Sequence, residues 1–122
     1  VMVQTKNRAL DLSFSFAIEL VKNCYDIQKK SKEYILTKQL IRSGSSIGAN
    51  LEEAIGGQSD KDFLAKIFIS YKEARETRYW LRLLFALDFI DETVFDKLSQ
   101  TVSELIRILG STISTLRKKL NK

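Results

Sequence analysis

The stretch of sequence that decides the fold is ILTKQLIRSGSSIGANLEEAIGG, residues 35–57. Its apolar and small residues recur at steps of three and four, a spacing that places them on one face of a helix. They are Leu36, Leu40, Gly44, Ile47, Leu51 and Ala54. Gly56 and Gly57 follow, and glycine tolerates the left-handed turn that ends many helices. The stretch predicts a helix over residues 35–55 that stops at a glycine pair.

The small-residue run SGSSIGA, residues 43–49, needs its own explanation. Each glycine inside a helix costs about 1 kcal/mol relative to alanine. Either a neighbouring helix approaches closely, or the run is a phosphate-binding loop. A P-loop follows a strand and ends in GK[ST], and both features are missing here. We therefore expect Gly44 and Gly48 to face a neighbouring helix.

Helical periodicity continues on both sides of this segment. Helices are predicted over residues 8–31, 59–87 and 91–119, with Ser59 and Asp91 as N-caps of the last two. The connections are short, so consecutive helices should be antiparallel neighbours. The sequence predicts an all-α chain, an antiparallel up-down-up-down four-helix bundle. Its 122 residues fit a single domain, 1–122.

The composition excludes most catalytic chemistry. The chain has no histidine and no proline, and Cys24 is its one cysteine. No Ser-His-Asp or Cys-His system, CxxC motif or common zinc site can be assembled from these residues. We expect no catalytic residue, metal, cofactor or small-molecule substrate, and we expect Cys24 in the core. No segment resembles a signal peptide or a membrane span, so we expect a cytoplasmic protein without a membrane partner.

The excess of positive charge lies at the C-terminal end of the chain. The chain carries 20 basic and 15 acidic residues, and its C-terminal end has no acidic residue near it in the sequence. Arginines between residues 75 and 82 interleave with Tyr71, Tyr79 and Trp80, a pattern typical of surfaces that stack on single-stranded nucleic acid. Subunit interfaces also favour Tyr, Trp and Arg, and the place of Trp80 on a second apolar stripe favours this alternative. The candidate nucleic-acid contacts are Arg75, Arg78, Arg82, Arg117, Lys118, Lys119 and Lys122. Cations also favour a helix C-terminus, which is the structural explanation of the tail.

The helix over residues 59–87 has a second apolar stripe. Its core face is predicted to consist of Phe63, Ile67, Ala74, Leu81 and Phe85, flanked by Leu64 and Tyr71. The other apolar residues fall roughly on the opposite side of a helical wheel, and they are Ile69, Trp80, Leu83 and Leu87. A monomer rarely exposes such a stripe, so these four residues predict a homo-oligomer interface.

Polar residues of two helices should meet when the chain folds back at Gly57. Arg42 then faces Glu73, and Asn50 or Glu53 approaches Lys66. An ion pair between Arg42 and Glu73 would fix the register of the two helices. The alternative is a polar pocket for a small ligand or a phosphate.

Two blocks of sequence carry a family resemblance. Residues 34–50, YILTKQLIRSGSSIGAN, and 72–84, KEARETRYWLRLL, resemble the four-helix-bundle proteins related to the intervening-sequence protein of bacterial 23S ribosomal RNA genes. The likeness covers about residues 11–110. Many members have an Ala-Glu pair after the asparagine, whereas this chain has the order Leu51-Glu52-Glu53-Ala54.

The resemblance implies an up-down bundle and a homopentamer. A relative, the accessory variability determinant of diversity-generating retroelements, is a basic pentameric bundle that binds nucleic acid and a reverse transcriptase. No catalytic residues are established in the family. The first hypothesis is therefore a non-enzymatic homo-oligomer that binds RNA, DNA or a ribonucleoprotein. The second is a protein-interaction scaffold without nucleic-acid contact, since the chain outside its tail is close to neutral.

Overall fold

A computed structural model describes the backbone of residues 2–121 and the side chains of residues 8–121. It contains α1 (Met2–Ser31), α2 (Ile35–Ile55), α3 (Asp60–Ala86) and α4 (Glu92–Leu120). No strand occurs in this part of the chain. The prediction of an all-α chain is confirmed. The expected limits of the last three helices hold to within one residue, whereas α1 begins at Met2 instead of near residue 8.

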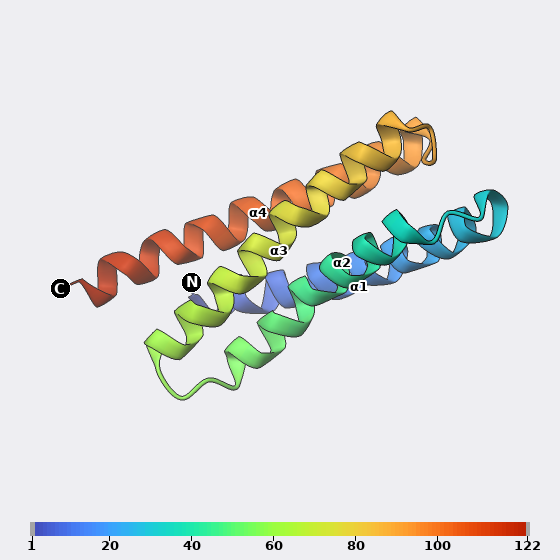
Figure 1. Ribbon diagram of the computed structural model, residues 1–122. Coiled ribbons are helices and arrows are strands. Elements are labelled where there is room, and N and C mark those ends of the chain that lie inside the picture. Colours follow the sequence, from blue (N-terminus) through green and yellow to red (C-terminus); the bar gives the residue numbers. More distant parts are fainter. Residues whose placement is uncertain (1, 122) are drawn as a thin grey trace.

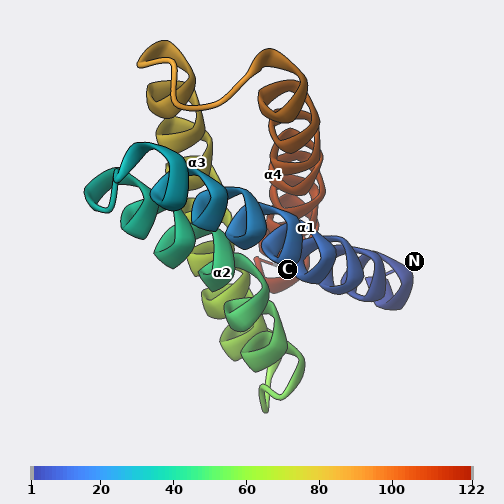
Figure 2. The same ribbon diagram turned by 90° about the vertical axis from the view of Figure 1, so that its right-hand side faces the viewer.

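The four helices form an up-down-up-down bundle. In Figure 1, α2 runs back along α1, and α4 runs back along α3. α2 also packs against α3, and α4 packs against α1, which closes the bundle. Figure 2 shows that α1 crosses α4 obliquely, so its N-terminal turns extend beyond the side of the bundle. The short connections enforce antiparallel neighbours, as the sequence predicts.

The core lies between the inner faces of all four helices. Leu20 of α1, Ile47 of α2, Leu81 of α3 and Leu105 of α4 are fully buried within it. Phe85 of α3 stacks on Phe95 of α4, with ring centroids 4.2 Å apart and planes 9° apart. Burial of apolar surface stabilises by about 25 cal/mol per Å², so this core supplies the main favourable term in folding.

Two helices begin at the predicted N-caps. Ser59 Oγ accepts a hydrogen bond from the Asp62 amide at 3.1 Å, and Asp91 Oδ1 accepts one from the Val94 amide at 2.9 Å. The start of α2 is capped differently. The Glu33 carboxylate accepts from the Leu36 and Thr37 amides, so it satisfies donors that have no partner inside the helix.

The end of α2 differs from the prediction. Gly56 has φ −81°, and none of the glycines has a positive φ. The left-handed residues are Lys32 and Asp88, in the other two connections. Gly57 matters for space instead: its amide donates to the Ala54 carbonyl, and an added Cβ would lie 3.0 Å from that oxygen. Glycine is therefore needed at residue 57 because the backbone at Ala54 comes close to it. A left-handed conformation is not the reason.

The small residues of α2 face α1, as predicted. A Cβ at Gly44 would lie 2.9 Å from Leu20 Cδ1, and one at Gly48 would lie 3.0 Å from Ser13 Oγ. On its other side, α2 meets α3 through paired hydroxyls, and Ser70 Oγ donates to the Ile47 carbonyl at 2.8 Å.

None of the helices described combines the length and the apolar character that crossing a membrane requires.

Candidate nucleic-acid interface

An aromatic and basic surface lies along the border of α3 and α4. A depression of about 350 Å³ is bounded by Phe68 and Tyr71 of α3 and by Gly110, Arg117 and Lys118 of α4. The Tyr71 ring packs against Gly110, where an added Cβ would be 3.5 Å from Tyr71 Cε1. Because α4 has no side chain at this point, the aromatic rings can lie against its backbone.

Cations and rings alternate along this surface. Arg117 Cζ lies 5.2 Å from the centroid of the Phe68 ring, and Arg75 Cζ lies 5.8 Å from that of Tyr71. The two ring centroids are 6.3 Å apart. Arg75 also donates to the Tyr71 hydroxyl at 3.2 Å. Guanidinium groups in such positions are held by the ring faces, while their donors stay open to solvent.

The cations of this face have no acidic partner among the side chains that the structure describes. Arg75 and Arg82 are exposed, and Arg78 is half-buried. All three follow Tyr71 at steps of three and four residues, so they share the flank of α3 that carries Tyr71. None of these three arginines, nor Arg117 or Lys118, forms an ion pair with any side chain of residues 8–121. Lys61 lines a second depression beside Phe68 and Arg117. We call this surface the basic face: Lys61, Phe68, Tyr71, Arg75, Arg78, Arg82, Arg117 and Lys118.

The end of the basic tail is different. Lys119 Nζ lies 2.8 Å from Asp60 Oδ2, so an acidic residue that is distant in the sequence pairs with this lysine. The antiparallel packing of α3 and α4 brings the acidic start of one helix beside the basic end of the other. Lys122 lies outside the described residues.

The polar residues expected between α2 and α3 form a network. Arg42 Nη1 lies 3.2 Å from Glu73 Oε2, and Arg42 Nη2 also pairs with Glu76. Glu76 Oε2 accepts a further hydrogen bond from Trp80 Nε1 at 2.9 Å. The Arg42 side chain remains 48% exposed, so the network fixes register and orientation more than it adds stability.

Of the two residues expected to approach Lys66, Glu53 does so. Lys66 Nζ lies 2.6 Å from Glu53 Oε1. Asn50 instead donates to the Ser46 carbonyl of its own helix at 2.8 Å.

The four residues of the second apolar stripe, which we call the apolar row, lie on the flank of α3 beside α2. Ile69 is 42% exposed and Leu87 is 50% exposed. Trp80 departs from the prediction: it is half-buried, packs against the core and meets Tyr79 edge to face at 5.1 Å. Leu83 is half-buried. Because α3 contacts two helices, its buried arc is wider than that of a helix with one neighbour, and it includes Trp80.

The described residues offer little for catalysis. Burial raises the pKa of the Cys24 thiol to about 12, and the nearby Glu33 carboxylate adds to this increase. A thiol that stays protonated is a poor nucleophile. No cluster of three or more acidic or cysteine side chains that could hold a metal ion occurs among them.

Sequence reasoning missed Lys61, Phe68 and Gly110. Phe68 follows the three- and four-residue spacing of Tyr71, Arg75, Arg78 and Arg82, which could have shown that it shares their flank. Lys61 lies seven residues before Phe68, so the same spacing could have placed it on this flank. Gly110 carries no such signal, because only the packing of α3 on α4 places it there.

Known proteins resemble this chain over most of its length. Residues 5–111 match the family described as 23S rRNA-intervening sequence protein. A crystal structure from Bacteroides thetaiotaomicron, described as a protein of unknown function from the S23 ribosomal protein family, is 37% identical with a TM-score of 0.87. The similarity covers 90% of this chain and 98% of that one. No curated protein matches the chain.

Proposed function

The chain belongs to the 23S rRNA-intervening sequence protein family, and from this premise we propose that it is a non-catalytic homo-oligomer that binds nucleic acid through its basic face. It works without a cofactor, a metal or a covalent step, and it acts in the cytoplasm. One observation carries the proposal: Arg117 and Arg75 lie over the rings of Phe68 and Tyr71 and have no acidic partner among the described side chains.

This arrangement suits a flexible single strand better than a duplex groove. Bases stack on aromatic and guanidinium planes with about 1–3 kcal/mol per base, whatever their sequence. Arginine and lysine beside the rings contact phosphates and release counterions. The basic face has no row of amide side chains that would read base edges, so we expect weak sequence preference.

Assembly would strengthen a modest site. The apolar row supports a homo-oligomer, because Ile69 and Leu87 leave large apolar side chains in water. The number five comes from the resemblance to pentameric relatives. Several basic faces on one particle would bind one strand together, and linked weak sites gain avidity.

The test is binding of a fluorescent single-stranded RNA of about 20 nucleotides, followed by anisotropy at several salt concentrations. We expect Arg75→Gln with Arg117→Gln to weaken binding at least tenfold. The slope of log K against log salt should fall by about 1.4, the value for two lost contacts to a single strand. Phe68→Leu keeps an apolar side chain but removes the ring, and should weaken binding about fivefold or more.

The matched control removes two other exposed cations, Lys22→Gln with Arg107→Gln. It should change affinity less than threefold. Equal losses in both double variants would mean that binding follows net charge alone. Absence of binding to RNA and DNA at low salt would favour the alternative, a protein-interaction scaffold without nucleic-acid contact.

A further inference from the structure

An apolar groove between α1 and α2 lies apart from the basic face. It has a volume of about 580 Å³ and is lined by Leu10, Phe14, Ala17, Gly48 and Ala49. Phe14 leaves 69% of its surface exposed, the second-highest value among the large apolar side chains. An exposed phenylalanine beside a floor of small residues is typical of a surface that another chain covers.

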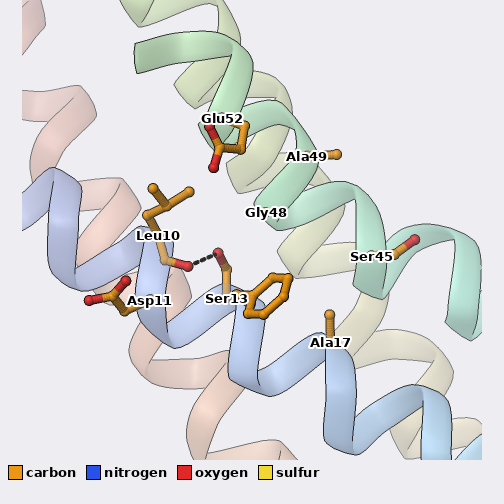
Figure 3. A pocket seen from close by; sticks show the side chains of 9 residues that line it. Leu10, Asp11, Ser13, Ala17, Ser45, Gly48, Ala49 and Glu52 are labelled. Carbon is orange, nitrogen blue, oxygen red and sulfur yellow. Dashed lines mark hydrogen bonds between the residues drawn. The ribbon is translucent and has the colours of Figure 1, made fainter. Parts of the chain in front are cut away.

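The hydroxyl groups of the groove are already satisfied. Ser13 Oγ donates to the Leu10 carbonyl at 2.9 Å, the bond drawn in Figure 3, and Ser45 Oγ donates to the Arg42 carbonyl at 3.3 Å. Both bonds stay within one helix. An occupant therefore meets apolar side chains and no competing hydroxyl donor from these two serines.

Charge is confined to one end of the groove. Figure 3 shows Asp11 and Glu52 at the same end, on either side of Leu10, with Ala17 and Ser45 at the other. Both carboxylates are exposed, and neither pairs with a cation within residues 8–121. The groove thus fits a partner that presents apolar side chains together with a cation.

The chain itself carries such a surface. The apolar row places Ile69, Trp80, Leu83 and Leu87 along one flank of α3, and Trp80 is held in position by its bond to Glu76. Lys72 is exposed between Ile69 and Trp80 in the sequence, and no described acidic side chain pairs with it. The row therefore combines apolar side chains with one cation, Lys72, that no described acidic side chain pairs, while the acidic Glu76 beside Trp80 is paired with Arg42. The groove is apolar with two carboxylates that no described cation pairs.

We infer that the groove between α1 and α2 receives the apolar row of a second copy of this chain, with Lys72 directed to Asp11 and Glu52. The inference rests on the proposed homo-oligomer and specifies its contact. The two surfaces differ, so the contact is head-to-tail. Each subunit uses its groove toward one neighbour and its row toward the other, and such contacts close into a ring when the rotation permits. The basic face stays free, since it lies on the flank of α3 beside α4.

Two blocked chains test this geometry. Phe14→Asp blocks the groove and Ile69→Asp blocks the row, and both residues are exposed enough for the helix content to remain native by circular dichroism. Each variant alone should be monomeric by native mass spectrometry. Mixed in equal amounts they should form a heterodimer, because the intact row of one fits the intact groove of the other.

Charge exchange tests the orientation. Glu52→Lys and Lys72→Glu should each weaken assembly about tenfold, through like charges at the contact. The double variant should recover to within about threefold of the parent. Asp26→Lys, an exposed reversal elsewhere on α1, is the matched control and should assemble like the parent.

The outcomes separate the two proposals. A heterodimer from the mixture, with recovery in the double charge variant, supports the inference. A parent chain that is monomeric at micromolar concentration overturns both the homo-oligomer and the head-to-tail contact. A parent oligomer whose mass is unchanged by Phe14→Asp, or a mixture that stays monomeric, overturns the inference alone.

Discussion

Single residues in this protein owe their properties to burial more than to their neighbours in sequence. Cys24 exposes 1% of its surface, between the fully buried Leu20 and the buried Ile27 of the same helix. Removing the thiolate from water disfavours the charged form, and the Glu33 carboxylate disfavours it further. Cys24 thus acts as a small apolar residue at ordinary pH.

This burial predicts how stability depends on alkaline pH. The thiol has a pKa of about 12 in the folded chain against 9.0 when unperturbed, so the folded state keeps a proton that the unfolded state loses. Its contribution is complete below pH 9 and is lost as pH rises toward 12, by up to about 1.4 kcal/mol per pH unit. Chemical denaturation of the parent and of Cys24→Ala at pH 8, 9.5 and 10.5 measures this. An unchanged difference between the two chains across that range would contradict it.

At the scale of helices, small residues decide how closely neighbours approach. Gly44 allows close approach of the fully buried Leu20 of α1, because a Cβ at residue 44 would lie only 2.9 Å from Leu20 Cδ1. The cost of glycine in a helix is about 1 kcal/mol, and the packing that its absence of side chain permits offsets this cost.

A large side chain at this point should separate the two helices. Gly44→Leu would overlap Leu20 and is expected to destabilise the chain by about 1–3 kcal/mol. Lys38→Leu adds similar apolar volume at an exposed position of the same helix and should stay within about 0.5 kcal/mol of the parent. Urea denaturation of the three chains compares these values. A Gly44→Leu chain as stable as the parent would mean that α1 and α2 are not limited by contact here.

On the scale of the whole molecule, the charged surfaces are separated. The basic face follows the border of α3 and α4, and the carboxylates of Asp11 and Glu52 lie at the groove between α1 and α2. The apolar row on α3 lies between these surfaces. A single chain therefore presents the proposed nucleic-acid surface and the two proposed self-assembly surfaces on different sides.

Within the apolar row, Trp80 and Ile69 should respond differently to the same substitution. Trp80 packs against the core, so Trp80→Asp is expected to dissociate the oligomer and to destabilise the subunit by about 2 kcal/mol. Ile69 is 42% exposed, so Ile69→Asp should dissociate it with a change in subunit stability near 0.5 kcal/mol or less. Thermal melts at monomeric dilution separate the two effects. Equal melting temperatures would mean that Trp80 contributes only to the interface.

The sequence by itself determined the helices, their order and two of their caps. Apolar spacing, glycine pairs and capping side chains act within a few residues, so local physics is enough to predict Ser59, Asp91 and the limits of α2. The same spacing predicted Phe63, Ile67, Ala74 and Leu81 in the core, whereas the predicted Phe85 is half-buried and the fully buried Leu84 was not predicted. The contact of Arg42 with Glu73 also followed, because a short loop leaves few registers for an antiparallel pair.

Only the tertiary structure decided which flank of each helix meets which neighbour. Lys119 forms an ion pair with Asp60, because the antiparallel packing of α3 and α4 brings these two distant residues together. Trp80 packs against the core because α3 has a neighbouring helix on two sides. Phe68 and Gly110 line the same depression because α4 packs on that flank of α3. The groove at Phe14 has Gly48 in its lining, at the point where α1 approaches α2 closely. Each of these outcomes depends on contacts between residues far apart in the chain, which no local pattern specifies.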